Sequence, residues 1–219
     1  MLSFSTDADL AKFEPNMFGS WYVTSQVLCS GSNGIVAGTQ FTASGVDFSA
    51  AQVDAGHMVY LESTDGVIKG AFEVVECIDS THLTVSVLRA STDQAAIPIG
   101  SASGLTWRIV TYAPQAYEML FKISQKLDLS PGCPDAEHSV VDITNPSALR
   151  QASIFGILAA VFEALYTGDD GQTVLIEKKE QYQWQFGKAI ERISMNIDTD
   201  DDGDADNSIV PSIGKMVRE

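Results

Sequence analysis

Residues 70–88 read Gly-Ala-Phe-Glu-Val-Val-Glu-Cys-Ile-Asp-Ser-Thr-His-Leu-Thr-Val-Ser-Val-Leu, and this stretch decides the fold of the region around it. Runs of β-branched and aromatic residues at 70–78 and 83–88 predict two strands. They flank Asp79-Ser80-Thr81, whose side chains favour a turn because they mimic backbone turn hydrogen bonds. A link this short forces the two strands to pair antiparallel.

The same kind of sequence extends on both sides of this hairpin, from residue 35 to residue 112. Further strands are predicted at residues 36–42, 58–62 and 105–111, and Thr64-Asp65-Gly66 is predicted to be a turn. Strands of this length predict a small antiparallel barrel or sandwich. Residues 30–34, Ser-Gly-Ser-Asn-Gly, are expected to form a loop on composition alone.

A short helical segment, residues 1–34, precedes this β-module, which we place at residues 35–112. Thr6-Asp7-Ala8-Asp9 has the form of a capping box, so a helix is expected from Asp7 to about Phe13, with Pro15 ending it. We expect the segment to pack on the helices that follow the β-module.

Three helices are predicted within residues 113–197. The first begins at Pro114, the second has Asn145 as its N-cap and runs to Tyr166, and the third runs from residue 173 to residue 197. The second helix is apolar around much of its circumference, which is typical of a helix central in a bundle or buried by a neighbouring subunit. Trp184 lies off the apolar stripe of the third helix, so it forms either a second contact face, which we expect, or an exposed aromatic side chain available to a partner.

The predicted fold class is therefore α+β. It comprises a C-terminal three-helix bundle, an antiparallel β-barrel or sandwich module inserted after a short N-terminal helix, and an extended C-terminal arm. Residues 198–219 supply an acidic hinge loop and this arm.

Residues 198–208, Asp-Thr-Asp-Asp-Asp-Gly-Asp-Ala-Asp-Asn-Ser, form the most acidic stretch. Carboxylates at alternate positions followed by a glycine suit Ca²⁺, which binds six or more oxygen ligands. The position at which a calcium loop supplies a bidentate glutamate holds Ile209 instead. A solvated acidic turn is the alternative to a cation site, and no other cofactor is expected. The candidate metal ligands are Asp198, Asp200, Asp202, Asp204 and Asp206.

Residues 209–219 alternate apolar and polar side chains around a proline, which predicts an extended arm too short to fold alone. Such an arm becomes ordered against its own domain or against another chain. The residues expected to make that contact are Ile209, Val210, Pro211, Ile213, Met216 and Val217.

Composition and charge exclude several classes of function. The 219 residues carry 13 basic and 29 acidic side chains, a net charge of −16, which argues against sequence-independent binding to a phosphate backbone. We expect no sequence-specific binding of nucleic acid either. Cys29, Cys77 and Cys133 are too scattered for a disulfide framework or a metal site. No signal peptide or membrane-length apolar run is present, so we expect a soluble protein made in a cytoplasm.

The sequence also lacks the motifs of common enzymes. GxSxG, HExxH, a papain-type cysteine context, GxGxxG after a strand and GxxxxGK[ST] are all absent. We therefore expect no catalytic residues and no enzymatic activity.

Three stretches carry a resemblance to a known family: residues 5–16, residues 148–158, and residues 177–197 leading into the acidic loop and the arm. Together they resemble the head-to-tail adaptor (connector) proteins of tailed bacteriophages. Residues 46–49, 53–59 and 70–75 look like β-modules of phage structural proteins, although the smallest adaptors are chiefly helical. Another neck protein, a stopper or tail-completion ring, is the nearest alternative. A calcium-dependent binding or adhesion module is a second.

The resemblance implies a virion structural protein of the neck that is assembled in the host cytoplasm. It implies a ring of identical subunits, a dodecamer, which docks beneath the portal protein and passes the genome through its lumen. The C-terminal arm would insert into the portal, and other neck or tail proteins would be further partners. No membrane is expected to take part.

Overall fold

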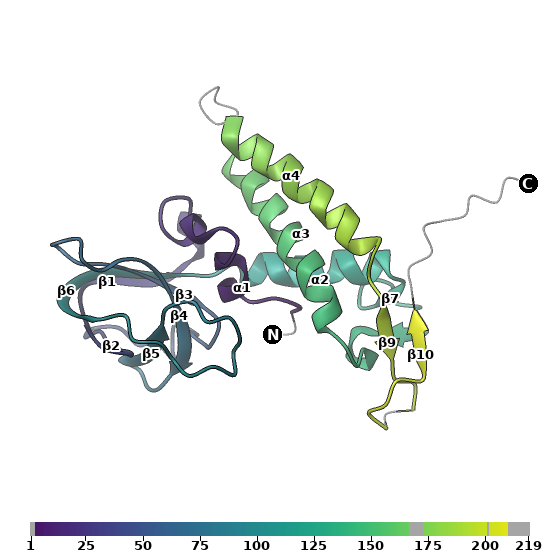
Figure 1. Ribbon diagram of the computed structural model, residues 1–219, viewed down its shortest axis with the longest axis horizontal. Helices are drawn as coiled ribbons and strands as arrows, with labels where there is room; N and C mark the ends of the chain where they lie inside the picture. The colour runs from purple at the N-terminus through teal and green to yellow at the C-terminus, as the bar shows by residue number, and fades with distance from the viewer. Residues whose placement is uncertain (1–2, 167–172, 201, 210–219) are drawn as a thin grey trace, which may run out of the picture. The chain divides into compact units, whose positions relative to one another are not determined.

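The computed structural model describes residues 3–166, 173–200 and 202–209 (Figure 1). It is mixed α+β, which confirms the predicted fold class at that level, and the β-module is a closed antiparallel barrel of six strands. The chain divides into two units, Thr6–Tyr112 and Met1–Ser5 with Ala113–Glu219. We call them the barrel unit and the helical unit and describe each by itself.

The barrel has the strand order β1-β2-β5-β4-β3-β6 and closes by antiparallel pairing of β1 with β6. Every neighbouring pair is antiparallel, and closure leaves no free sheet edge. The strands are β1 (Val27–Ala37), β2 (Gln40–Thr42), β3 (Met58–Glu62), β4 (Lys69–Cys77), β5 (His82–Ser86) and β6 (Ser101–Val110).

The hairpin predicted at residues 70–88 is confirmed as β4 and β5. Asp79 makes the turn as expected: its Oδ1 accepts hydrogen bonds from the backbone N–H of Thr81 at 2.8 Å and of His82 at 2.9 Å. The short polar link therefore fixes the pairing of the two strands.

Two predictions in the barrel are wrong. Residues 30–34 are not a loop but lie within β1, where register shifts against β6 occur around Gly31 and Gly34. A Cβ added at Gly31 would lie 2.9 Å from the Trp107 indole, and one at Gly34 would lie 2.8 Å from it. These glycines mark a close approach within a sheet, which composition does not distinguish from a loop.

The strand predicted at residues 36–42 is two strands, because the chain reverses at Gly38 and Thr39 and pairs Ala37 with Gln40. Gly38 has φ +66°, a conformation that glycine adopts readily and that suits a two-residue hairpin turn.

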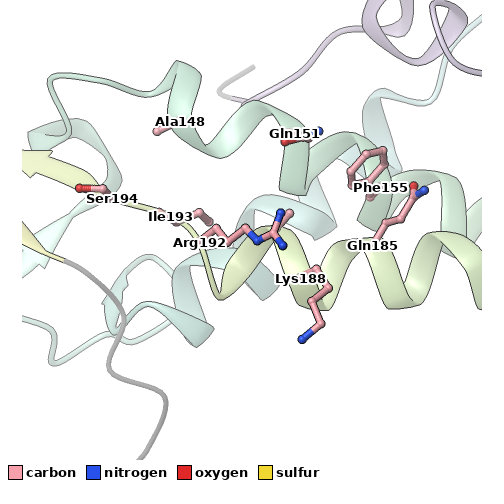
Figure 2. A pocket seen from close by; sticks show the side chains of 9 residues that line it. Ala148, Gln151, Phe155, Gln185, Lys188, Arg192, Ile193 and Ser194 are labelled. Atoms are coloured by element: carbon pink, nitrogen blue, oxygen red, sulfur yellow. The ribbon is translucent and has the colours of Figure 1, made fainter.

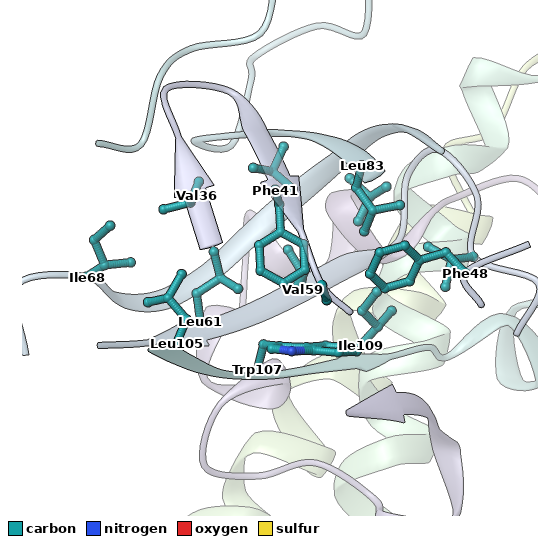
Figure 3. Packing of buried hydrophobic residues seen from close by; sticks show 14 residues of the cluster. Val36, Phe41, Phe48, Val59, Leu61, Ile68, Leu83, Leu105, Trp107 and Ile109 are labelled. Atoms are coloured by element: carbon teal, nitrogen blue, oxygen red, sulfur yellow. The ribbon is translucent and has the colours of Figure 1, made fainter. Parts of the chain in front are cut away.

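The barrel core centres on three aromatic rings (Figure 3). The ring centroids of Phe41 and Phe48 each lie 5.6 Å from that of Trp107, in edge-to-face contacts. The centroids of the two phenylalanine rings lie 6.1 Å apart. Such pairs add to the stabilisation that burial alone gives. Aliphatic side chains complete the cluster, among them Val36, Val59, Leu61, Ile68, Leu83, Leu105 and Ile109.

An ion pair is buried at the end of the barrel wall. Glu73 of β4 accepts from Arg89 through both carboxylate oxygens, with Nη2 at 2.7 Å from Oε1 and Nε at 3.2 Å from Oε2. Arg89 Nη1 also donates to the backbone oxygens of Thr92 and Gln94. The pair thereby anchors the long connection from β5 to β6.

Replacing Arg89 by Met should cost about 3–5 kcal/mol of stability, because Glu73 would be left buried without its cation. Urea unfolding of the full chain measures this. The double variant Glu73→Gln with Arg89→Met should recover part of the loss. A single variant as stable as the wild type would mean that the pair contributes nothing.

The N-terminal capping box is also confirmed. Helix α1 (Asp7–Ala11) starts with Thr6 and Asp9 bonding to each other's backbone N–H groups, and it ends two residues before the predicted Phe13. Pro15 then begins a short 3₁₀ helix, η1 (Pro15–Phe18); a second, η2 (Thr24–Gln26), leads into β1.

Asp7 links the start of the barrel unit to its end. Its Oδ1 accepts from the backbone N–H of Tyr112 at 2.8 Å, and the side chain is buried. Burial raises the pKa of Asp7 to about 7.

This shift predicts a pH dependence of folding. Between about pH 4 and pH 7 the unfolded chain has lost the Asp7 proton and the folded chain keeps it, so stability should fall by up to about 4 kcal/mol as the pH rises through this range. Asp7→Asn keeps the acceptor for Tyr112 and should remove this part of the slope. Unfolding curves at several pH values test it, and identical slopes for the two proteins would contradict it.

In the helical unit, α3 (Ser147–Leu165) contacts both α2 (Ala113–Lys126) and α4 (Thr173–Ile190). An added Cβ at Gly156 would lie 2.3 Å from Met119 Sδ, so this glycine permits α2 to pack closely on α3. Between α3 and α4, the Tyr182 ring of α4 stacks on the rings of Phe155 and Phe162, with centroid distances of 6.0 and 5.9 Å. Helix α3 is thus a core helix of its unit.

Helix α3 also has the length and mean hydropathy of a membrane span, with 56% of the qualifying window buried inside the structure. We interpret it as a core helix because its apolar side chains are used in packing. The buried residues are Leu149, Ala152, Ser153, Ile154, Phe155, Gly156, Ile157, Leu158, Val161 and Phe162.

Two short strand pairs complete the helical unit. β7 (Leu129–Ser130) pairs parallel with β8 (His138–Ser139), which leads into the 3₁₀ helix η3 (Val140–Asp142). β9 (Met195–Ile197) pairs antiparallel with β10 (Asn207–Ile209).

The predicted end of the third helix at residue 197 is therefore wrong, since α4 ends at Ile190. Buried Ile193, Met195 and Ile197 alternate with more exposed neighbours, and this period of two is the signature of a strand. The predicted N-cap at Asn145 is wrong too. Its side chain instead accepts from Asn196 N–H at 2.8 Å and donates to the Ser194 carbonyl at 3.1 Å, and so holds the start of β9.

Candidate functional site

The acidic loop, residues 198–206, joins β9 to β10 and forms the turn of a hairpin. We expected a hinge here, whereas the strands on either side are paired: Ile197 lies opposite Asn207, and Met195 opposite Ile209. Gly203, with φ +89°, donates its N–H to Asp198 Oδ2 at 2.8 Å and closes the turn.

Three of the five candidate ligands come together. Carboxylate oxygens of Asp198, Asp200 and Asp206 all lie within 4.8 Å of one another. Hydrogen bonds from the hydroxyl and backbone N–H of Thr199 lower the pKa of Asp206, so it carries its charge at neutral pH. The spacing suits a cation that takes oxygen ligands, with the remaining ligands from backbone or water.

The other two candidates are not in this cluster. Asp202 Oδ1 accepts from the backbone N–H of Asp204 at 2.8 Å, and both side chains are exposed. They contribute charge to the loop and no ligand to the cluster of three.

The candidate arm is described only at its first residue. Ile209 lies in β10 opposite Met195. Val210, Pro211, Ile213, Met216 and Val217 lie outside the described residues.

The sequence did not predict a groove between α3 and α4, of about 390 Å³ (Figure 2). Figure 2 shows Phe155 of α3 and Gln185 of α4 at one end of it and Ser194 at the other. The signal available in the sequence was the like-charge pair Lys188 and Arg192, four residues apart and so on one face. The groove is lined by Ala148, Gln151, Phe155, Gln185, Lys188, Ala189, Arg192, Ile193 and Ser194.

The two cations of the α3–α4 groove differ in their partners. Lys188 Nζ pairs with Glu191 at 2.7 Å, whereas Arg192 pairs with no carboxylate among the described residues. Gln185 Oε1 is buried and has no hydrogen-bond partner in the described part of the chain. Groups of this kind can receive an anionic or peptide-like ligand.

Helix α4 leaves apolar side chains in solvent. Trp184 is 65% exposed and Val174 is 53% exposed, while Tyr182 is buried against α3. The prediction that Trp184 forms a second contact face within the chain is therefore wrong. Its indole is available to another molecule.

The barrel wall also carries a hollow, of about 490 Å³, beside Arg108. The guanidinium is stacked between Tyr22 and Tyr60, at 4.3 and 4.2 Å from the ring centroids, and donates to the Gly19 carbonyl. These contacts hold the cation in place, so we assign it a structural role.

Comparison of the chain with protein-family models, with curated proteins and with solved structures finds no match.

If the acidic loop binds calcium, isothermal titration at millimolar Ca²⁺ should give heat that Asp200→Ala and Asp206→Ala each abolish. Asp204→Ala is the matched control, because Asp204 lies outside the cluster of three, and it should bind nearly as well as the wild type. Absence of heat with the wild-type chain would exclude calcium binding by the acidic loop.

Proposed function

We propose that the protein is a non-enzymatic virion structural protein, a head-to-tail adaptor of a tailed bacteriophage. It forms a ring of identical subunits beneath the portal protein and passes the genome through the lumen. The C-terminal arm, from Ile209 onward, binds the portal. Assembly takes place in the host cytoplasm, and the mature protein lies in the virion neck.

The observation that carries the proposal is the exposure of two large apolar side chains on α4. Trp184 and Val174 are more than half exposed, although α3 beside them is well buried. Covering apolar side chains of this size contributes about 1.5–3 kcal/mol each, and in a ring every subunit makes its contact with two neighbours. A second chain is the natural cover for such side chains.

The charge of the chain supports the same proposal. A lumen through which DNA slides must not grip phosphates, and a net charge of −16 suits that requirement. We propose that α2, α3 and α4 act as a three-helix bundle and build the wall of the ring. A stopper or tail-completion ring would need the same properties.

A calcium-dependent binding or adhesion module is the second candidate. It is favoured by the cluster of Asp198, Asp200 and Asp206 oxygens. The calorimetric experiment above separates it from the adaptor, since a ring held by apolar and charged contacts needs no calcium.

Deleting residues 211–219 should leave the fold intact and abolish joining to portal-bearing heads. Circular dichroism measures the fold, and co-sedimentation with purified heads measures joining. Val67→Ser in the full-length chain is the control: Val67 is an exposed barrel residue, so its replacement should leave joining unchanged. If the truncated protein still joins portal-bearing heads as well as the full-length chain, the proposal is wrong.

A further inference from the structure

The α3–α4 groove is complementary to an acidic segment. Arg192 has no carboxylate partner among the described residues, and Lys188, near the end of α4, lines the same groove. Phe155 and Ala189 add apolar surface to the lining.

The acidic loop has the charge and shape to enter such a groove. Asp200, Asp202 and Asp204 are exposed, and the carboxylates of Asp200 and Asp204 accept no hydrogen bond within the described residues. Gly203 lies at the turn with no side chain to hold the backbone away from a partner. The loop therefore presents charge on a narrow turn.

The α3–α4 groove and the acidic loop lie at opposite ends of the β9–β10 hairpin. Ser194 lines the groove, and its hydroxyl lies 3.3 Å from that of Ser208 at the base of β9 and β10. Three residues per strand separate this base from the acidic loop, a distance of about 10 Å. Figure 1 shows the loop on the side of the hairpin away from α4. The loop of one chain therefore points away from its own groove.

From this geometry we infer that the acidic loop of one copy docks in the α3–α4 groove of the next copy. The inference rests on the proposed ring of identical subunits and names the contact that builds it. Because the two surfaces differ, the contact is head-to-tail, and it closes into a ring when the rotation between neighbours permits. The C-terminal arm fits the groove less well, since residues 210–219 include Lys215 and Arg218.

Two charge-reversal variants test the contact. The groove variant carries Lys188→Glu and Arg192→Glu, and the loop variant carries Asp202→Lys and Asp204→Lys, which spares the cluster of Asp198, Asp200 and Asp206. Sedimentation at low ionic strength should show an oligomer for the wild-type chain and a monomer for each variant alone. An equimolar mixture should assemble again, because the acidic loop of the groove variant meets the unchanged groove of the loop variant and the new lysines of the loop variant face the new glutamates of the groove variant.

The control variant carries Lys122→Glu and Lys126→Glu, the same charge change on exposed positions of α2, and should assemble like the wild type. Added salt should weaken the oligomer. A monomeric wild type, a groove variant that still assembles, or a mixture that stays monomeric would overturn the inference. Assembly lost on deleting residues 211–219 while the groove variant still assembles would make the arm the occupant instead.

The outcomes separate this contact from the adaptor function. Oligomers that depend on the groove but do not join portal-bearing heads would leave the contact standing and remove the adaptor. Rings that join heads and withstand both charge reversals would leave the adaptor standing and remove the contact.

Discussion

The barrel depends on the packing of the Trp107 indole against two glycines of β1. At Gly31 and Gly34 any side chain would come within 3 Å of the ring, so only glycine lets β1 follow β6 at this distance. That pairing closes the sheet, and a closed sheet has no edge that another strand can join. The barrel unit thus pairs its strands among themselves and buries its own aromatic cluster.

The helical unit, in contrast, leaves apolar and charged side chains exposed among its described residues. Tyr182 fastens α4 to α3, but Trp184 on the same helix faces solvent, and Arg192 just beyond it has no ionic partner among the described residues. An acidic hairpin loop on the same unit carries the opposite charge, and its exposed Asp200, Asp202 and Asp204 form no ion pair among the described residues. Exposed apolar and charged side chains on one unit are what an assembling subunit requires, and for this reason the self-association that we propose involves the helical unit.

The sequence predicted what local patterns determine. The β4–β5 hairpin followed from the turn chemistry of Asp79, and the capping box followed from Thr6 and Asp9. It did not predict features that depend on distant partners. The composition around Gly31 and Gly34 predicts a loop, because nothing in the neighbouring sequence indicates that Trp107, far along the chain, packs against these glycines. The predicted third helix extends over β9, because the partner strand β10 lies beyond the acidic loop. Of the five candidate aspartates the fold gathers three, and the groove was missed because its lining comes from two helices.

Negative-stain electron microscopy of the purified full-length chain at low ionic strength tests the central claim, self-association into a ring, most directly. We predict closed rings of uniform diameter with an open centre. A field of single subunits, at concentrations where the protein remains folded and soluble, would contradict the claim.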